Sequence, residues 1–595
     1  MSSSILAGSA RLAARQIARH APLSRPQLSA AVSAVRIAAV SPSSSKFITH
    51  HTADSSIISS FRRAYATESG PSPSPKQSAP SSSKFKLFGL YLWRLTYGSA
   101  ILGVAYVGYA LYDSRHPYDQ MPPDPSKKTL VVLGSGWGAV SLLKKLDTEN
   151  YNVIVVSPRN FFLFTPLLPS CTTGTIENRS IMEPLRHILR HKKASVTFYE
   201  AECTSIDPVN RTLLLRDNSE IKGETYETSL PFDYLVIGVG AQNTTFGIPG
   251  VQENACFLKE IQDAQKIRTR IMDCIETATF KDQSPEERKR LLHFVVVGGG
   301  PTGIEFAGEL QDFFEEDLRK WVPEIGSDFK VSLIEALPNV LPMFSKELIS
   351  YTERSFQDQK IDIKSKTMVK KVTDKAIFAE ATNADGTKSM IELPYGLLVW
   401  ATGNAPRPVV RDLMSKIPEQ AKSRRGLEVN DYMVVNGTEG IWAVGDCAAT
   451  SYAPTAQVAT QQGAYLARLL NSLAKTNALE EKVLELEDLV AATSSLDDKK
   501  AITVEIENKE KSLRRTKTIG PFQYTHQGAL AYIGSDKAIA DFAFADGRKV
   551  ASSGELTFLF WRSAYVSMVF STRNKMLVVF DWIKVKMFGR DVSRE

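Results

Sequence analysis

The sequence has few cysteines, almost no acidic residues near its N-terminus and no long hydrophobic run. The five cysteines include no C-x-x-C pair, so neither a zinc site nor a disulfide framework is indicated, and no metal site is predicted. No Asp or Glu precedes Asp54, whereas arginines are spaced along the same stretch among Ser and Ala. An acid-poor, Arg-rich N-terminus of this kind is typical of a mitochondrial transit peptide, which we predict over residues 1–65.

The positive charge of the chain is concentrated in that first segment. The formal net charge is +7, and the basic residues of positions 1–65 account for it, since Asp54 is the single acidic residue among them. Because the remainder is nearly neutral, no nucleic acid partner is predicted. A chain of 595 residues, 43% of them hydrophobic, can form two or three domains.

One uncharged stretch near the N-terminus approaches the length of a membrane span. Residues 66–83 are rich in Ser and Pro and predict a flexible linker. The run from Leu95 to Tyr112 has no charge, so we predict a transmembrane segment within residues 84–112, with a buried core helix as the alternative. Basic residues precede this run and acidic residues follow it, which predicts that the rest of the chain faces the intermembrane space: Lys84, Lys86 and Arg94 before, Asp113 and Asp119 after.

Two glycine-rich turns, about one domain apart, are the most informative motifs. Each follows a strand-length run of β-branched residues and precedes a helical pattern: Gly134, Gly136, Gly138 and Ala139 in the first, Gly298, Gly300 and Gly303 in the second. Glycine allows the backbone to approach a pyrophosphate at the N-terminus of the following helix. Two such turns predict two dinucleotides, and the simplest chemistry that needs both is hydride transfer from a nicotinamide to a flavin.

The residues that end the second strand of each unit differ. The first unit has Ser157 where a dinucleotide fold usually places an acid for the ribose, which weakens the motif there. In the second unit the strand Lys330–Ile334 is followed by Glu335, which is positioned to bind the adenosine ribose hydroxyls. A carboxylate repels a 2′-phosphate, so NADH is predicted over NADPH.

The order of these units predicts an α/β protein with two Rossmann-like domains, the second inserted in the first. We predict the first dinucleotide domain over residues 125–290 and 401–470 and the second over 291–400. Residues 471–517 carry apolar residues at helical spacing among many charges and predict a helical hairpin. Residues 518–595 mix aromatic, aliphatic and Lys residues, which is typical of interfacial membrane helices, with core packing as the alternative.

Several motifs, in one order, carry a resemblance to a known family. They are Phe162–Ser170, Phe257–Ala264, Gly300–Glu305 and Ala456–Gln461. The chain resembles the flavoprotein disulfide-reductase fold and, within it, the mitochondrial type II (alternative, rotenone-insensitive) NADH:ubiquinone oxidoreductases, specifically a fungal external form. The resemblance covers residues 125–470 and 519–595.

The resemblance implies where the cofactor and the nicotinamide substrate bind. FAD would lie on the first glycine turn, with Asp446 accepting hydrogen bonds from its ribityl or phosphate region, although an ordinary turn Asp is the alternative. NADH would lie on the second turn. Glu305 would lie at the contact between nicotinamide and flavin, where it orients the ring or assists the proton balance; the alternative is a helix N-terminal Glu that only complements the helix dipole.

The resemblance also implies the electron acceptor. Ubiquinone would lie near Gln457 and Gln461, which could instead be capping or core glutamines, and Thr460 stands where some relatives have His. The implied protein is a flavoenzyme of the mitochondrial inner membrane, in contact with its lipid, that transfers two electrons from NADH on the cytosolic side to ubiquinone without proton pumping. A homodimer and the quinone species are left open.

Two other functions fit part of the sequence. A sulfide:quinone oxidoreductase needs a redox-active cysteine pair at the flavin, and only Cys171 lies in a suitable stretch. A flavoprotein of the apoptosis-inducing-factor type would act through partners, for which the helical hairpin would serve. The latter would reduce quinone slowly and would not depend on Gln457.

Overall fold

The computed structural model describes residues 82–594 apart from 118, 327, 384, 494, 516–518 and 544–548. The predicted transit peptide, residues 1–65, lies outside these residues, and so does the predicted linker except for its last two positions. Those two positions begin helix α2 (Ser82–Arg115). From Phe85 on, the chain forms one compact unit.

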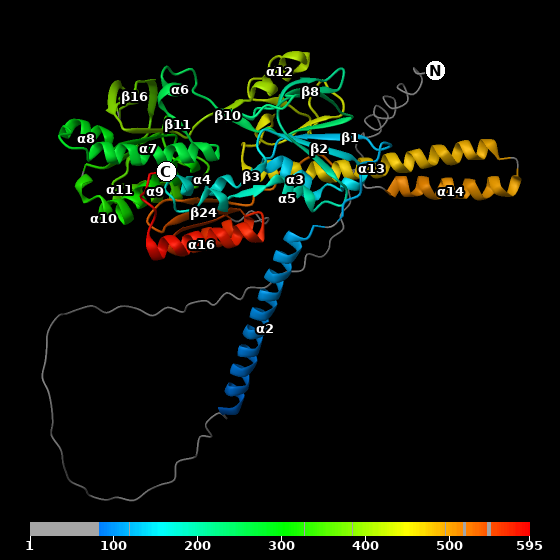
Figure 1. Ribbon diagram of the computed structural model, residues 1–595, viewed down its shortest axis with the longest axis horizontal. Helices are drawn as coiled ribbons and strands as arrows, with labels where there is room; N and C mark the ends of the chain where they lie inside the picture. The colour runs from blue at the N-terminus through cyan, green and yellow to red at the C-terminus, as the bar shows by residue number, and fades with distance from the viewer. Residues whose placement is uncertain are drawn as a thin grey trace, which may run out of the picture. The chain divides into compact units, whose positions relative to one another are not determined.

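The first sheet is parallel and belongs to the lobe that carries the first glycine turn (Figure 1). Its strands have the order β21-β9-β1-β2-β5, and their apolar residues are buried on both faces. Helices cover one face, and the antiparallel sheet β6-β7-β8 covers the other together with α12. The strand β21 comes from far along the chain and pairs with β9, so the sheet is completed after the second lobe. The bounds are β1 (Thr129–Leu133), β2 (Asn152–Ser157), β5 (Val196–Glu200), β9 (Tyr234–Ile237) and β21 (Ile441–Ala443), with helix α3 (Trp137–Lys145) after β1.

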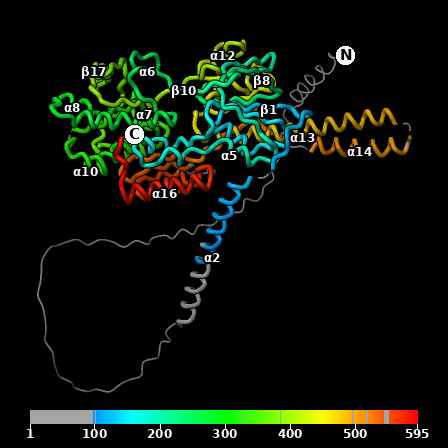
Figure 2. Tube along the Cα trace, viewed as in Figure 1, coloured from blue at the N-terminus to red at the C-terminus, as the bar shows by residue number. Residues whose placement is uncertain are grey.

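The second lobe has the same plan. Its parallel sheet has the order β11-β18-β12-β13-β14, and helix α9 (Pro301–Phe313) follows β12. An antiparallel sheet, β15-β16-β17, adjoins it, and the two-lobed path can be followed along the trace (Figure 2). The bounds are β11 (Cys256–Phe257), β12 (His293–Val297), β13 (Lys330–Ile334), β14 (Asp362–Lys364), β15 (Thr367–Val372), β16 (Ala376–Thr382), β17 (Lys388–Pro394) and β18 (Leu397–Trp400). Both predicted Rossmann-like sheets are thus confirmed.

Smaller elements complete the two lobes. The short strands form the pairs β3-β4 (Phe161–Leu163, Met182–Pro184), β10-β19 (Ala241–Asn243, Asn404–Pro406) and β20-β22 (Leu427–Glu428, Ala448–Ala449), and the sheet β6-β7-β8 (Glu202–Asp207, Thr212–Arg216, Glu227–Pro231). The helices are α4 (Leu168–Thr172), α5 (Leu185–Arg190), α6 (Val251–Asn254), α7 (Ile261–Ala278), α8 (Pro285–Leu291), α10 (Arg319–Trp321), α11 (Lys346–Asp358) and α12 (Pro408–Lys416).

Two long helices form the predicted hairpin. The helix α13 (Ala456–Ala492) lies beside α14 (Leu496–Arg515), and the pair extends away from the first lobe (Figure 1). The helix α13 runs through residue 471 without a break, so the boundary predicted there is not a structural one. Its first half is buried against α3, whereas its second half contacts α14.

Helix α2 corrects a prediction. In the part of the chain that the structure covers, no helix is both long enough and apolar enough to cross a membrane. The structure therefore gives no support to the transmembrane segment predicted over residues 84–112. At the C-terminal end of α2, the rings of His187 and His191 donate hydrogen bonds to the carbonyls of Ser114 and Asp113, each at 3.1 Å.

The C-terminal region packs a three-stranded sheet and two helices against α9. Helices α15 and α16 bury one face, including Trp561 and Trp582, and expose apolar side chains such as Phe560 and Ile583 on the other. The bounds are β23 (Ala529–Tyr532), β24 (Ala538–Ala543), β25 (Lys549–Gly554), α15 (Glu555–Met568) and α16 (Thr572–Phe588).

A buried ion cluster fixes the end of the chain to this arrangement. Arg590, only 8% exposed, donates to Asp317 at 2.9 Å, to Glu316 at 2.7 Å and to the Thr175 hydroxyl at 2.8 Å. Both carboxylates belong to a π-helical turn, Phe314–Leu318, that continues α9. The cluster therefore ties the C-terminal segment to both lobes.

Replacing Arg590 by Met should lower the free energy of unfolding by about 3–5 kcal/mol, because Asp317 would remain buried without a counter-ion. Denaturant unfolding followed by tryptophan fluorescence measures this difference. Arg594→Met is the matched control, since Arg594 is exposed and pairs only with Asp273, at 3.1 Å. Its effect should stay below about 1 kcal/mol, and equal losses in the two variants would contradict the structural role of the cluster.

Candidate active site

The first glycine turn leaves space for a phosphate at the start of α3. Gly134 has φ +107°, and a Cβ there would collide with the carbonyl oxygen of Gly238. A Cβ on Gly136, in contrast, would meet nothing within 4 Å. Gly138 and Ala139 are buried and pack against Val444 and Gly238 respectively. Bare backbone facing open space at a helix N-terminus fits the pyrophosphate of a bound FAD.

The second glycine turn repeats this geometry. Gly298 has φ +117°, and a Cβ there would lie 2.7 Å from the carbonyl oxygen of Ala401. A Cβ on Gly300 would meet nothing within 4 Å, whereas one on Gly303 would collide with the carbonyl of Gly298. The turn thus combines a tight helix–strand contact with an open cradle, which fits a second dinucleotide.

The carboxylate of Glu335 is fixed beside this second cradle. Its Oε2 accepts a hydrogen bond from the Gly299 N–H at 2.5 Å, and its Oε1 accepts one from the Leu337 N–H at 2.7 Å. Both contacts orient the side chain at the end of β13, where ribose hydroxyls of a bound nucleotide would lie. The role stays a prediction.

In the first lobe, the position of the missing ribose acid is surrounded by residues that sequence reasoning overlooked. Ser157 donates to the Ser135 hydroxyl at 3.0 Å, and the Arg159 Nε donates to the same oxygen at 3.3 Å. Arg159 also pairs with Glu260, which pairs in turn with Arg407 at 3.0 Å. Glu260 lies in the motif Phe257–Ala264, so this motif could have identified Glu260 from the sequence.

Asp446 lines a cavity of about 320 Å³ together with Asn404, Tyr452 and Thr455. Burial raises the pKa of Asp446, although the ammonium of Lys259, 3.9 Å away, opposes the shift. Asp446 lies in a short turn, Gly445–Cys447, which contacts α13 in space although β22 separates the two in the chain. The placement is suited to a carboxylate that accepts hydrogen bonds from ligand hydroxyls.

Glu305 is buried, not placed at an exposed helix start. It is 6% exposed, and its Oε1 accepts a hydrogen bond from the Tyr532 N–H at 3.3 Å. Burial raises the pKa of Glu305 to about 8, and the nearby charge of Glu309 adds to the shift. Glu305 is therefore neutral near pH 7 and can hold a proton, which disfavours a purely dipolar role for it.

Two more carboxylates follow Glu305 along α9 and differ in their partners. Glu309 accepts hydrogen bonds from Ser170 at 2.6 Å and from Thr175 at 2.7 Å. Asp312 accepts a hydrogen bond from the Tyr532 hydroxyl, and burial raises the pKa of Asp312 to about 7. Sequence analysis missed both, although their spacing of three and four residues from each other and from Glu305 places them on one helix face.

The structure brings Gln457 and Gln461 against the loop that precedes β23. The Gln457 Nε2 donates to the Gly528 carbonyl at 2.8 Å, and its Oε1 accepts from the Tyr524 hydroxyl at 3.1 Å. Gln461 exchanges two hydrogen bonds with the backbone of Thr525, at 2.8 and 3.0 Å. Each amide nitrogen thus donates one hydrogen bond to a described residue and keeps a second N–H that could donate to a ligand. No sequence signal pointed to Tyr524.

The cysteines do not form the pair that a sulfide oxidoreductase requires. All five are free and buried, and burial raises the pKa of the Cys171 thiol well above its usual value. A buried, protonated thiol without a partner cysteine is a poor nucleophile. Cys171 therefore gives the sulfide:quinone alternative no support.

Comparisons with known proteins agree with this geometry. The profile of the family described as pyridine nucleotide-disulphide oxidoreductase matches residues 128–463, and that of the NDH2 C-terminal domain matches residues 526–591. An external alternative NADH-ubiquinone oxidoreductase of Yarrowia lipolytica is 63% identical over 88% of this chain and 90% of its own length. The chain belongs to the type II NADH:ubiquinone oxidoreductase family.

Other family members are similar over nearly their whole length. External NADH-ubiquinone oxidoreductase 2 of Saccharomyces cerevisiae is 47% identical over 89% of this chain and 95% of its own. The NDH2 of Plasmodium falciparum, solved in complex with NADH, is 27% identical, with a TM-score of 0.67 over 78% of this chain and 100% of its own. The resemblance inferred from the sequence is thereby confirmed. A bacterial sulfide:quinone oxidoreductase, 18% identical with a TM-score of 0.53, shares the fold alone.

For this type II enzyme we expect Glu335→Gln to relax the preference for NADH over NADPH by about 1–3 kcal/mol, because the 2′-phosphate would no longer face a carboxylate. The ratio of kcat/KM for the two nucleotides measures the change. Glu347→Gln, an exposed residue of α11, is the control and should leave the ratio unaltered. An unchanged ratio in the Glu335 variant would remove the assignment.

Proposed function

We propose that this chain is a mitochondrial FAD-dependent enzyme that transfers two electrons from NADH to ubiquinone. The observation that carries the proposal is the presence of two open glycine cradles, at Gly136 and Gly300, in one compact unit. One cradle would hold FAD and the other NADH. Names of the similar proteins, which include NADH and ubiquinone, support the same donor and acceptor.

Each cradle has its own set of ligand-binding residues. Gly134, Gly136, Gly138, Ala139 and Asp446 would hold FAD, and Gly298, Gly300, Gly303 and Glu335 would hold NADH. When bound, FAD accepts a hydride from the nicotinamide and releases two electrons to the quinone. The protein orients the two ligands and keeps bulk water away from the buried residues between them.

The carboxyl group of Glu305 can hold the proton that quinol formation requires. A hydride carries one proton with its two electrons, so forming a quinol from NADH and a quinone takes one further proton from solvent. Glu305 is neutral near pH 7 and lies in the first turns of the helix that follows the NADH cradle. It can therefore hold this proton in the buried region. This chemistry moves no charge across a bilayer, so the proposal includes no proton pumping.

The quinone is proposed to bind at Gln457. The free N–H of this amide can donate to a quinone carbonyl, because Tyr524 and Gly528 hold the rest of the group in one orientation. The amide lies in the first turn of α13, close to Asp446 in the chain and on the FAD lobe. Tyr524 is thus a positioning residue for Gln457.

A contact with inner-membrane lipid is proposed for the C-terminal helices. Helices α15 and α16 expose several large apolar side chains, which favours contact with a lipid surface: Leu556, Leu559, Phe560, Ile583 and Phe588. Because its similar proteins are named external, we place the catalytic unit on the intermembrane-space side. Protease added to mitoplasts should cut the unit, and protection until the inner membrane is lysed would refute this side.

Stopped-flow absorbance tests the proposed function. In the wild type, NADH should bleach the flavin and ubiquinone should restore its absorbance. Gln457→Leu should bleach normally but regain absorbance about tenfold or more slowly with quinone, since it loses a hydrogen bond to the carbonyl. Tyr524→Phe should show a smaller defect of the same kind.

Two controls separate this result from general damage. Gln357→Leu, an exposed residue of α11, should behave like the wild type, and ferricyanide, which needs no hydrogen bond, should reoxidise every variant equally. Slowed bleaching in the Gln457 variant would disprove its quinone role. Slow quinone reduction by the wild type itself would favour the apoptosis-inducing-factor type of function.

The proton role of Glu305 predicts a pH dependence. A carboxyl with a raised pKa is protonated below that pKa, so reoxidation by quinone should be steady up to about pH 8 and fall about tenfold per unit above it. Glu305→Gln should be slow at every pH and lack this limb, while its flavin bleaching by NADH stays intact. If the rate of reoxidation still falls above about pH 8 in the variant, a group other than Glu305 holds the proton.

A further inference from the structure

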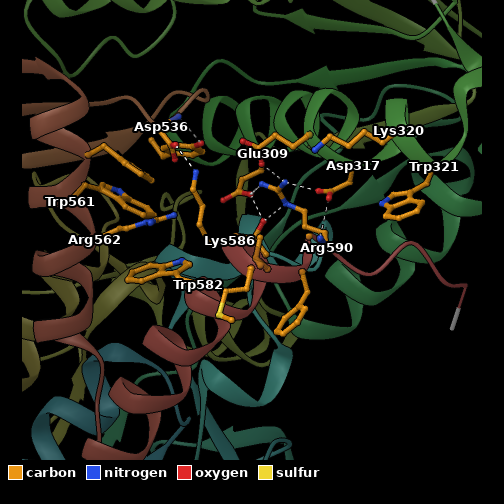
Figure 3. A pocket seen from close by; sticks show the side chains of 18 residues that line it. Glu309, Asp317, Lys320, Trp321, Asp536, Trp561, Arg562, Trp582, Lys586 and Arg590 are labelled. Atoms are coloured by element: carbon orange, nitrogen blue, oxygen red, sulfur yellow. Dashed lines mark hydrogen bonds and ion pairs between the residues drawn. The ribbon is translucent and has the colours of Figure 1, made fainter.

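A second cavity, of about 410 Å³, lies between the end of α9 and the C-terminal helices (Figure 3). No residue of either glycine turn lines this cavity, as far as the described residues show. One side of the cavity carries Arg590 with its carboxylate partners, and the other carries Trp561, Arg562 and Trp582. The cavity therefore belongs to neither dinucleotide cradle nor to the Gln457 site.

Arg562 is a cation of this cavity that forms no ion pair with a described residue. Its guanidinium carbon lies 4.3 Å from the ring centre of Phe558 and 5.0 Å from that of Trp582. Its Nε is buried without a hydrogen-bond partner, and among the residues that the structure places, no carboxylate lies within 4 Å of it. Burial lowers the pKa of Arg562, because the guanidinium has lost water, although the charge of Asp536 opposes the shift.

Two other cations of the cavity wall, Arg590 and Lys586, differ from Arg562 in this respect. Arg590 is neutralised by Glu316 and Asp317, and Lys586 lies 3.5 Å from Asp536. Figure 3 shows the Arg562 guanidinium between Trp561 and Trp582 and directed into the cavity. A planar guanidinium held between aromatic rings is preorganised to bind an oxyanion by its fork of N–H donors.

We propose that this cavity binds the phosphate of a membrane phospholipid, with Arg562 as the anion-binding group. The proposal rests on the proposed lipid contact of α15 and α16 and identifies its ligand chemistry. A phosphodiester would accept hydrogen bonds from the Arg562 guanidinium, with the Lys586 ammonium as a second cation of the wall. The cavity volume suits one head group and not a pair of acyl chains.

The surface beside the cavity favours a lipid over a free anion. Met587 and Phe588 line the cavity and are also 68% and 75% exposed. Ile583 and Phe580 continue the exposed apolar surface along α16. A ligand with an anionic head and acyl chains would fill the cavity with the head and cover this surface with the chains, as interfacial helices require.

Binding of soluble phospholipids to the full-length holoenzyme in an uncharged maltoside detergent tests the proposal. The probes are dihexanoyl-phosphatidylglycerol, inorganic phosphate, and dihexanoylglycerol, which has the chains without the phosphate. Tryptophan fluorescence titration should detect the phosphatidylglycerol because Trp561 and Trp582 flank Arg562, and native mass spectrometry should show one molecule bound. Neither of the other probes should bind at the same concentrations.

Arg562→Gln should weaken phosphatidylglycerol binding by about tenfold or more, the usual effect of losing a charged hydrogen bond. Lys575→Gln removes one charge from α16 away from the cavity and should bind like the wild type. Flavin absorbance and the melting temperature report whether each variant folds. Should Arg562→Gln not fold, Arg562→Lys replaces it, and loss of the stacked fork should still weaken binding several-fold.

Three outcomes would overturn the proposal. Equal binding of inorganic phosphate would make this a free-anion site, equal binding of dihexanoylglycerol would make it an apolar one, and wild-type affinity in the tested Arg562 variant would remove the residue from the site. NADH-driven quinone reduction is measured on the same samples. Its presence without lipid binding refutes this proposal alone, whereas its absence in the wild type refutes the proposed function.

Discussion

Helix α9 is buried and carries several carboxylates, so the C-terminal segment of the chain must supply polar partners for them. The helix begins at the second glycine cradle and carries Glu305, Glu309 and Asp312 along its buried face. Water cannot solvate these groups, and each must be paired, hydrogen-bonded or protonated. The partners come from strand β23, from the α4 region and from the end of the chain, so burial of this one helix joins both lobes to the C-terminal region.

The carboxylates meet this constraint in different ways. The difference distinguishes those with a structural role from the one with a proposed role in proton transfer. Asp317 and Glu316 pair with Arg590, and Glu309 accepts hydrogen bonds from the hydroxyls of Ser170 and Thr175, so these groups have polar partners in the buried region. Among the described residues no cation pairs with Glu305, and burial raises its pKa to about 8, so it is protonated near pH 7. A proton held there, in the helix that follows the second glycine turn, is useful to the proposed reaction, which consumes one proton for each quinol formed.

The sequence was sufficient for features that depend on local backbone geometry. The glycine turns, the two parallel sheets and the place of Glu335 follow from short-range patterns, because a β-strand, a tight turn and a helix start are specified within about ten residues. The contacts of Gln457 were beyond reach, since Tyr524 lies across the whole hairpin from it in the chain. The span predicted over residues 84–112 rested on the absence of charge, and it finds no support because the Tyr and Gly residues there have only moderate hydropathy.

The C-terminal helices connect the buried carboxylates of α9 with the exposed apolar surface of the protein. Their buried face brings Trp561 into the cavity wall beside Tyr532, whose backbone N–H meets Glu305 and whose hydroxyl meets Asp312. Their other face exposes Phe560, Ile583 and Phe588. One layer of helices thus completes the protonated region of α9 and offers an apolar surface outside. A lipid-soluble acceptor needs both at once: a bilayer from which it arrives and a nearby buried acid that can supply its proton.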